Sequence, residues 1–201
     1  MPYLGNGITL SIITPEGFKL KEYRDDNNNC FVEGVVGDNY ELLIHSELRR
    51  VLVVPSVDGL NVLSHKSAAR QDVGYILKAY SKLIVPGWAY QYKKITKFVF
   101  FDKTKSHKSQ NKQIGVIGCA FYIERNVLIP DRFLSRVASK AAIFISSDSF
   151  DRGEIIADGR IFYTHREELE KMGIVVESAP TTYLPNPFPV DGLQVGKEVH
   201  E

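Results

Sequence analysis

The sequence predicts a mainly β protein, an antiparallel β-sandwich similar to a jelly roll, with a small α/β appendage and an extended C-terminal arm. Short segments in which apolar and polar residues alternate predict strands with one buried face. Turn signals recur about every ten residues through the first two-thirds of the chain, a spacing typical of sandwiches. The content of 44% apolar and 24% charged residues is that of an ordinary globular protein.

Two kinds of strand are predicted in the first two-thirds of the chain. Residues 8–12 (ITLSI) and 40–45 (YELLIH) alternate in polarity and are expected to be half-buried. Residues 50–57 (RVLVVPSV), 97–102 (KFVFFD) and 114–124 (IGVIGCAFYIE) are almost continuously apolar, as in strands that are covered on both faces. Because proline cannot donate to a β-ladder, the proline in the first of these three segments predicts a sheet edge or a bulge.

Two hexapeptides are nearly identical, VDGLNV at 57–62 and VDGLQV at 190–195. Asp-Gly between apolar residues is a strong signal for a type I′ hairpin turn, in which both central residues have positive φ. The sequences that flank the two copies differ, so the recurrence indicates the same turn used twice rather than a repeated domain. The predicted turn residues are Asp58, Gly59, Asp191 and Gly192.

The last third of the sequence changes in style. Residues 130–142 (PDRFLSRVASKAA) carry apolar residues at helical spacing after a proline, which predicts a short helix. Residues 154–164 (EIIADGRIFYT) predict either two strand halves joined at Asp158-Gly159 or one bulged strand.

A second helix is expected directly after this strand. Thr164 and Glu167 have the spacing of a capping box, and Gly173 supplies a C-terminal stop. The next residues, 174–177 (IVVE), predict a further strand.

These elements divide the chain into three parts. Residues 1–128 form the predicted sandwich core, residues 129–178 an α/β appendage packed on it, and residues 179–201 a proline-rich arm. The arm is expected to dock either on its own subunit or on a neighbouring one. The residues of this possible assembly arm are Tyr183, Leu184, Phe188, Val190 and Leu193.

Charge and cysteine content limit the classes of function. Lysine and arginine number 25 against 24 acids, so no overall field attracts the chain to nucleic acid or to an anionic membrane. No stretch reaches the ~18 apolar residues of a membrane span, and the N-terminal sequence lacks the pattern of a signal peptide. A cytoplasmic or virion location is therefore expected. Cys30 and Cys119 match neither a disulfide framework nor a zinc motif and are predicted to be buried free thiols.

Asp58, His65 and Asp72, together with Ser56 or Ser64, are the residues that could form a hydrolase site. Their spacing matches no motif that fixes such a geometry. Aspartate, serine and histidine are also common in turns, so a solvated loop accounts for all of these residues and is the favoured interpretation. We predict no catalytic, cofactor-binding or metal-binding residue and no cofactor.

The most strongly charged region runs from Lys93 to Lys112, where seven lysines and His107 face one acid, Asp102. One interpretation is a hairpin in solvent whose lysines protect a sheet edge. The other is a surface that, with Trp88 and nearby tyrosines, binds an anionic polymer or a carbohydrate. The possible contacts to an anionic partner are Lys93, Lys94, Lys97, Lys103, Lys105, Lys108 and Lys112.

The run RRVLVVPSVDGLNVL at 49–63, followed by GYIL, VPGWAY, KFVFFD and IGVIGCAFYIE, resembles an uncharacterised family of bacterial and viral proteins with the block V-x-S-V-D-G-L-x-V. The similarity covers residues 33–124. It implies a compact β-sandwich module and brings no known activity or catalytic residues.

The leading hypothesis from the sequence is a non-enzymatic structural protein, such as a minor capsid or decoration protein of a phage or virus. The partners would be other protein subunits, contacted through the C-terminal arm, with no role for a membrane and nucleic acid a weaker alternative. The near-neutral charge, the proline-rich arm and the lack of a catalytic motif motivate it. The alternatives are a binding module that uses residues 93–112 and Trp88, and a hydrolase near Asp58.

Overall fold

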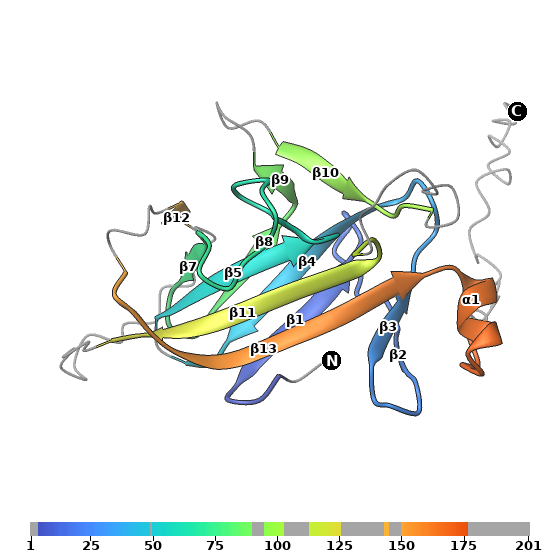
Figure 1. Cartoon of the computed structure of the whole chain (residues 1–201), viewed down its shortest axis with the longest axis horizontal. Helices are drawn as coiled ribbons and strands as arrows, with labels where there is room; N and C mark the ends of the chain where they lie inside the picture. Colours follow the sequence, from blue (N-terminus) through green and yellow to red (C-terminus); the bar gives the residue numbers. More distant parts are fainter. Residues whose placement is uncertain are drawn as a thin grey trace, which may run out of the picture.

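Two β-sheets face each other and enclose the main hydrophobic core (Figure 1). The computed structural model describes residues 4–48, 50–89, 95–102, 113–125, 143–144 and 150–176. The predicted mainly β, sandwich-like fold is confirmed, with antiparallel sheets and little helix. The predicted helix at 130–142 and the arm at 179–201, with its turn at Asp191-Gly192, lie outside the described residues.

The smaller sheet has five strands around β4, which pairs with β1, β8 and β10. Buried and half-buried residues alternate along β4, as the sequence predicts for a strand with one face in the core. The strands of this sheet are β1 (Ile8–Ile13), β4 (Asn39–Ser46), β8 (Ser81–Val85), β9 (Gly87–Ala89) and β10 (Ile95–Val99).

The larger sheet has eight strands, and β11 and β13 cross its centre, in front of β1 and β4 in Figure 1. Its neighbours pair antiparallel except for β13 and β3, which run parallel. Its strands are β2 (Glu22–Arg24), β3 (Cys30–Glu33), β5 (Val51–Val57), β6 (Leu60–Asn61), β7 (Tyr75–Leu77), β11 (Val116–Glu124), β12 (Ile143–Phe144) and β13 (Arg152–Thr164).

Strand β13 is a single strand with a bulge, which is one of the two forms expected for residues 154–164. The pairing with β11 shifts register near Tyr122, opposite Ile155 and Ala157. Ala157, Ile161 and Tyr163 lie in the main core. This strand therefore belongs to the larger sheet, and is not part of an appendage packed against it.

Pro55 lies inside the larger sheet, where β5 pairs with β11 on one side. On the other side, the pairing with β7 ends at Val53 and that with β6 begins at Ser56. The Pro55 carbonyl accepts a hydrogen bond from the Val62 N–H on this second side. The side of Pro55 that lacks an N–H faces the gap between β7 and β6. The sheet edge that the proline predicts is therefore confined to this gap.

The turn between β5 and β6 has the predicted form. Asp58 and Gly59 both have positive φ, 51° and 79°, and they connect the paired residues Val57 and Leu60. These are the properties of a two-residue type I′ hairpin. The first Asp-Gly prediction is thus confirmed.

Helix α1 (Arg166–Lys171) forms where the sequence predicts it, but the capping box is wrong. Thr164 is still part of β13, and the N-cap is His165, whose side chain makes no capping hydrogen bond. Gly173, with φ of 79°, ends the helix as predicted: its N–H and that of Ile174 bond back to the last turn in a Schellman motif.

The strand predicted at 174–177 does not form in its described part, because residues 174–176 have an irregular backbone. Ile174 and Val176 are buried, and Val175 between them is 82% exposed. The alternation that suggested a strand instead reflects a segment that covers one end of the larger sheet together with α1.

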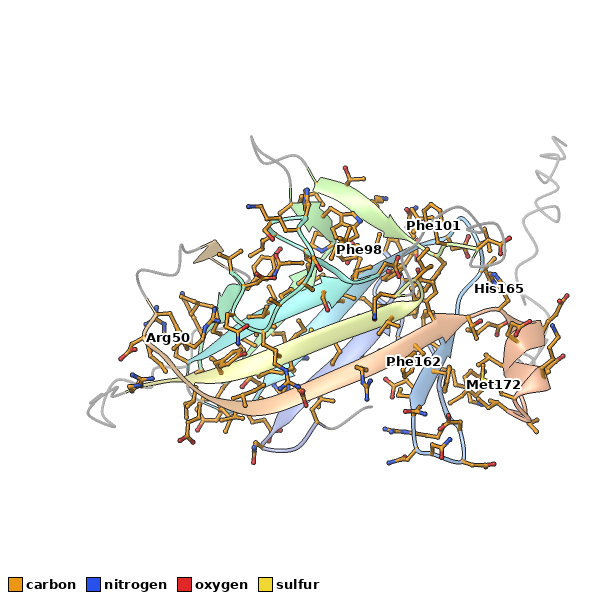
Figure 2. The ribbon with its side chains drawn as sticks, viewed as in Figure 1. Arg50, Phe98, Phe101, Phe162, His165 and Met172 are labelled. Carbon is orange, nitrogen blue, oxygen red and sulfur yellow. The ribbon has the colours of Figure 1, made fainter. Side chains whose placement is uncertain are left out.

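The outer face of the larger sheet carries two hydrophobic clusters, one toward each end. One is built on Leu52, Val54, Ala120 and Tyr122, and the other on Phe31 and the residues around α1. Figure 2 shows Phe162 and Met172 at the α1 end and Arg50 at the other end. The sheet rows between these clusters form the floor of a groove.

Candidate functional site: an arginine-lined groove

One part of the groove is formed by the residues of β13 whose side chains lie on the outer face of the larger sheet. Ala157, Ile161 and Tyr163 point into the core, so the residues between them, Asp158 and Arg160, lie on the outer face. The pairing register places Arg160 beside Gly118 and Asp158 beside Ala120. A charged pair on one strand is thus set next to small residues on its neighbour.

The floor of the groove is low because its side chains are small. Ser56 and Val54 of β5 continue the two rows that contain Gly118 and Ala120. A Cβ atom at Gly118 would lie 2.8 Å from the Ser56 Oγ, so any side chain there would displace the hydroxyl and raise the floor. The resulting groove has a volume of about 610 Å³.

One wall of the groove is the turn between β2 and β3. The Asp25 carboxylate accepts hydrogen bonds from the backbone N–H groups of Asn27 and Asn29 and from the Asn29 side chain. The bond from the Asn29 side chain is the main reason that the pKa of Asp25 is lowered. The Arg24 guanidinium donates to the Asn28 carbonyl at 2.8 Å and the Asn28 Oδ1 at 3.2 Å. Arg24 is therefore held at the rim by a structured turn.

The opposite wall is the loop between β6 and β7, which carries Arg70. The Arg70 carbonyl accepts hydrogen bonds from the Tyr122 hydroxyl at 2.7 Å and from the Arg152 guanidinium at 3.2 Å. The Arg70 guanidinium forms an ion pair with Asp158 on β13. These contacts tie the loop to the sheet and hold the Arg70 side chain over the groove.

The lining of the groove carries an excess of positive charge. Arg24, Arg70 and Arg160 face one acidic residue, Asp158, which already pairs with Arg70. The guanidinium of Arg160 has no hydrogen bond or ion pair with any residue in the described ranges. An arginine has five donors in a planar fork that suits carboxylate and phosphate oxygens. The arrangement can therefore bind an oxyanion.

Both cysteines also border the groove, but as buried thiols. Burial raises the pKa of Cys30 to about 11 and raises that of Cys119 further. A protonated thiol is a poor nucleophile and metal ligand. The prediction that the two cysteines are free and buried is confirmed.

Asp58, the leading residue of the hypothetical hydrolase site, is engaged in a structural contact. Its carboxylate accepts hydrogen bonds from the Gly115 N–H at 2.7 Å and the Tyr163 hydroxyl at 2.9 Å. Burial, followed by the nearby Asp58 charge, raises the pKa of Tyr163. The contact joins the β5–β6 turn to β11 and β13.

The other two residues of that hypothetical site have separate contacts. The Asp72 carboxylate accepts from the Ala69 N–H at 2.7 Å, within its own turn. The His65 ring meets the Trp88 ring edge-on at 5.8 Å between centroids. Among the residues described here, no group of three or more His, Cys, Asp or Glu side chains is placed to hold a metal ion.

The loop that carries these residues is organised by Asn61, which the sequence analysis did not single out. Asn61 is fully buried. Its side chain donates to the Val73 carbonyl at 3.0 Å and accepts from the Leu63 and Ser64 N–H groups at 2.9 and 2.8 Å. It closes the loop on itself, as asparagine does in turns.

Replacing Tyr163 by phenylalanine should lower the free energy of unfolding by about 2 kcal/mol, because a buried hydrogen bond to a charged group is lost. The matched control is Tyr40→Phe. The Tyr40 ring lies 6.0 Å from that of Tyr163, and its buried hydroxyl has no hydrogen-bond partner among the described residues. That control removes a buried hydroxyl that gains no hydrogen bond among the described residues, so it should not lower the free energy of unfolding. Equal losses in urea unfolding of both variants would contradict this assignment.

The lysine-rich segment is mostly outside the described residues. Only Lys97 is described, and it lies on the exposed side of β10; Lys93, Lys94, Lys103, Lys105, Lys108 and Lys112 are not. Trp88 is half-buried and packs edge-on against Phe98 at 5.3 Å. Its ring thus contributes to the main core.

The sequence analysis missed the three arginines of the groove. One signal was available for Arg160: in a strand, Asp158 and Arg160 must share the face opposite to Ile161 and Tyr163. Arg24 and Arg70 gave no such signal, because Arg24 is brought to β13 by the parallel pairing of β13 with β3, and Arg70 by its ion pair with Asp158.

No family model, curated protein or solved structure matches the chain. These comparisons give no support to the family resemblance noted above. Within the described ranges, the structure has no helix with the length and apolar character needed to cross a membrane.

Proposed function

We propose that the protein is a non-enzymatic binding module that holds an anionic group of a partner in the arginine-lined groove. The observation that carries the proposal is the Arg160 guanidinium, which has no hydrogen bond or ion pair among the described residues and lies above a floor of small side chains, with Arg24 and Arg70 in the same lining. Oxyanions bind well to such sites because arginine can offer them two parallel hydrogen bonds.

The positions of the walls also support binding. Arg24 is held by the β2–β3 turn and Arg70 by its ion pair and by Tyr122. Side chains that are fixed before binding lose less conformational entropy when a ligand arrives. These contacts orient two of the three arginines before a ligand arrives.

The sequence-based hypothesis of a virion component, such as a minor capsid or decoration protein, stays a proposal of its own. Its contact segment at 179–201 is outside the described residues. The hydrolase alternative has less support, because Asp58, His65 and Asp72 have separate contacts. The hydrogen bonds of the Asp58 carboxylate to Gly115 and Tyr163 give it a structural role, which does not require a substrate.

Retention on phosphocellulose tests the proposed function. Wild-type protein should be retained and should elute later than Arg160→Gln, because the groove supplies the local positive charge that the near-neutral chain lacks overall. Lys97→Gln is the matched control: it removes the same charge from an exposed strand residue on the other sheet.

The two variants separate the two charged surfaces. Earlier elution of Arg160→Gln alone supports the groove. Earlier elution of Lys97→Gln alone would overturn the proposal in favour of the lysine-rich segment, and retention that neither change alters would overturn it as well.

A further inference from the structure

We infer that the groove binds a small organic ligand with a phosphate or carboxylate group, which Arg160 and Arg24 hold together; this inference rests on the proposed function. It goes beyond that function because it gives the size of the ligand and the anchoring residues. Three properties of the groove lead to it.

The first property is the volume. About 610 Å³ falls within the range of sites that enclose small molecules, roughly 300 to 1,000 Å³. The two outer-face clusters border the groove, because Val54 and Ala120 of one cluster and Phe162 at the other are among its lining residues. A small molecule fits within this volume.

The second property is that the three arginines differ in their hydrogen-bond and ion-pair partners. Arg70 forms an ion pair with Asp158, and the negative charge of Asp158 weakens the attraction of Arg70 for an anionic ligand. Among the described residues, the Arg160 guanidinium forms no hydrogen bond or ion pair, and the Arg24 guanidinium donates hydrogen bonds to the neutral Asn28. Arg160 projects from the outer face of β13, whereas Arg24 lies on the edge strand β2, in the row of the core residues Cys30 and Ile161, and lines the groove at its rim. An oxyanion between them would receive donors from two directions.

The third property is the mixed lining. Leu4, Val54, Ala120 and Phe162 provide apolar surface, and Ser56 and Asn29 provide polar groups. Small-molecule sites typically combine such apolar walls with a few placed polar groups. The ligand should therefore have a compact body attached to its oxyanion.

Isothermal titration calorimetry with two separate probes, inorganic phosphate and citrate, tests the inference on the full chain. At least one probe should bind with one-to-one stoichiometry, and the probe that binds identifies the preferred oxyanion. Arg160→Gln and Arg24→Gln should each weaken binding at least tenfold, because each removes charge-assisted hydrogen bonds. Lys97→Gln should bind as the wild type does.

Gly118→Ala separates the groove from general electrostatics. The added methyl group raises the floor without changing the charge, so binding of the probes should weaken although all three arginines are still present. Thermal melting checks that each variant is folded. Because Arg160 and Arg24 lie on separate strands, one unfolded variant leaves the other as the test.

Two results would overturn the inference. One is the absence of saturable binding of both probes in the millimolar range. The other is binding that Arg160→Gln and Arg24→Gln leave unchanged. If retention on phosphocellulose still depends on Arg160 while both probes fail to bind, the proposed function stands and only the small ligand is rejected.

Discussion

Replacing Gly74 by alanine is expected to destabilise the protein by about 4 kcal/mol or more, at the upper end of what single substitutions do. Gly74 immediately precedes β7, which pairs with β5. A Cβ atom there would lie 2.1 Å from the Val53 carbonyl oxygen and 2.8 Å from its carbon. Both are backbone atoms of a strand that pairs on its other side with β11, so they cannot move without disturbing the sheet.

Gly37→Ala is the control for this effect. Gly37 has φ of 92° and open space around its Cα, so alanine there meets conformational strain without a clash. That strain is about 1 to 2 kcal/mol. Urea unfolding, with the midpoint and slope both fitted, measures the two losses. A loss for Gly74→Ala no larger than that for Gly37→Ala would contradict the close approach of β5 and β7.

Alkaline solution should unfold the protein between about pH 10 and pH 11.5, because five buried groups must keep their protons in the folded state. Burial is the main reason in each case. It raises the pKa of Tyr75 to about 12 and that of Cys30 to about 11. The pKa values of Tyr40, Tyr163 and Cys119 are also raised.

The direction of the effect follows from the two states. Below the unfolded pKa values, about 8.5 for a thiol and about 10 for a phenol, both states keep these protons and the stability is complete. At higher pH the unfolded state loses protons that the folded state retains, so stability falls until the folded pKa is reached. Each group removes at most about 1.4 kcal/mol per pH unit.

The contributions of the thiols and the tyrosines can be separated by the pH at which each begins to lower the free energy of unfolding. In the wild type, the free energy of unfolding should begin to fall near about pH 8.5, where unfolded thiols ionise, and fall more steeply from about pH 10. In the double variant Cys30→Ala with Cys119→Ala, only the second phase should remain. Urea unfolding at half-unit pH steps measures both curves. A wild-type stability that is constant to about pH 10.5 would contradict the burial of these groups.

The parts of the fold that the sequence predicts are those that depend on neighbouring residues. Alternation identifies β4, continuous apolar runs identify β5 and β11, and positive φ at Asp58 and Gly59 follows from the Asp-Gly dipeptide. Gly173 ends α1 for a similar local reason. Each depends on backbone geometry within a few residues.

The parts that the sequence does not predict depend on long-range pairing. Thr164 has capping-box spacing, but the parallel pairing of β13 with β3 keeps it in the strand. The groove combines Arg24, Arg70 and Arg160 through the registers of four different strand pairs. No periodicity within one segment contains that information, so the candidate site could not be derived from the sequence.

The position of β13 has a consequence for the synthesis of the protein. This strand is the link between β11 and the β2–β3 hairpin, although residues 22–33 are translated long before it. Until the ribosome has released residues up to Thr164, the hairpin has no strand beside it, and β11 keeps one row of backbone groups open to water. A nascent chain must therefore carry the hairpin without its neighbouring strand through most of translation, and β11 with one open edge until β13 follows, a state in which chaperones commonly bind.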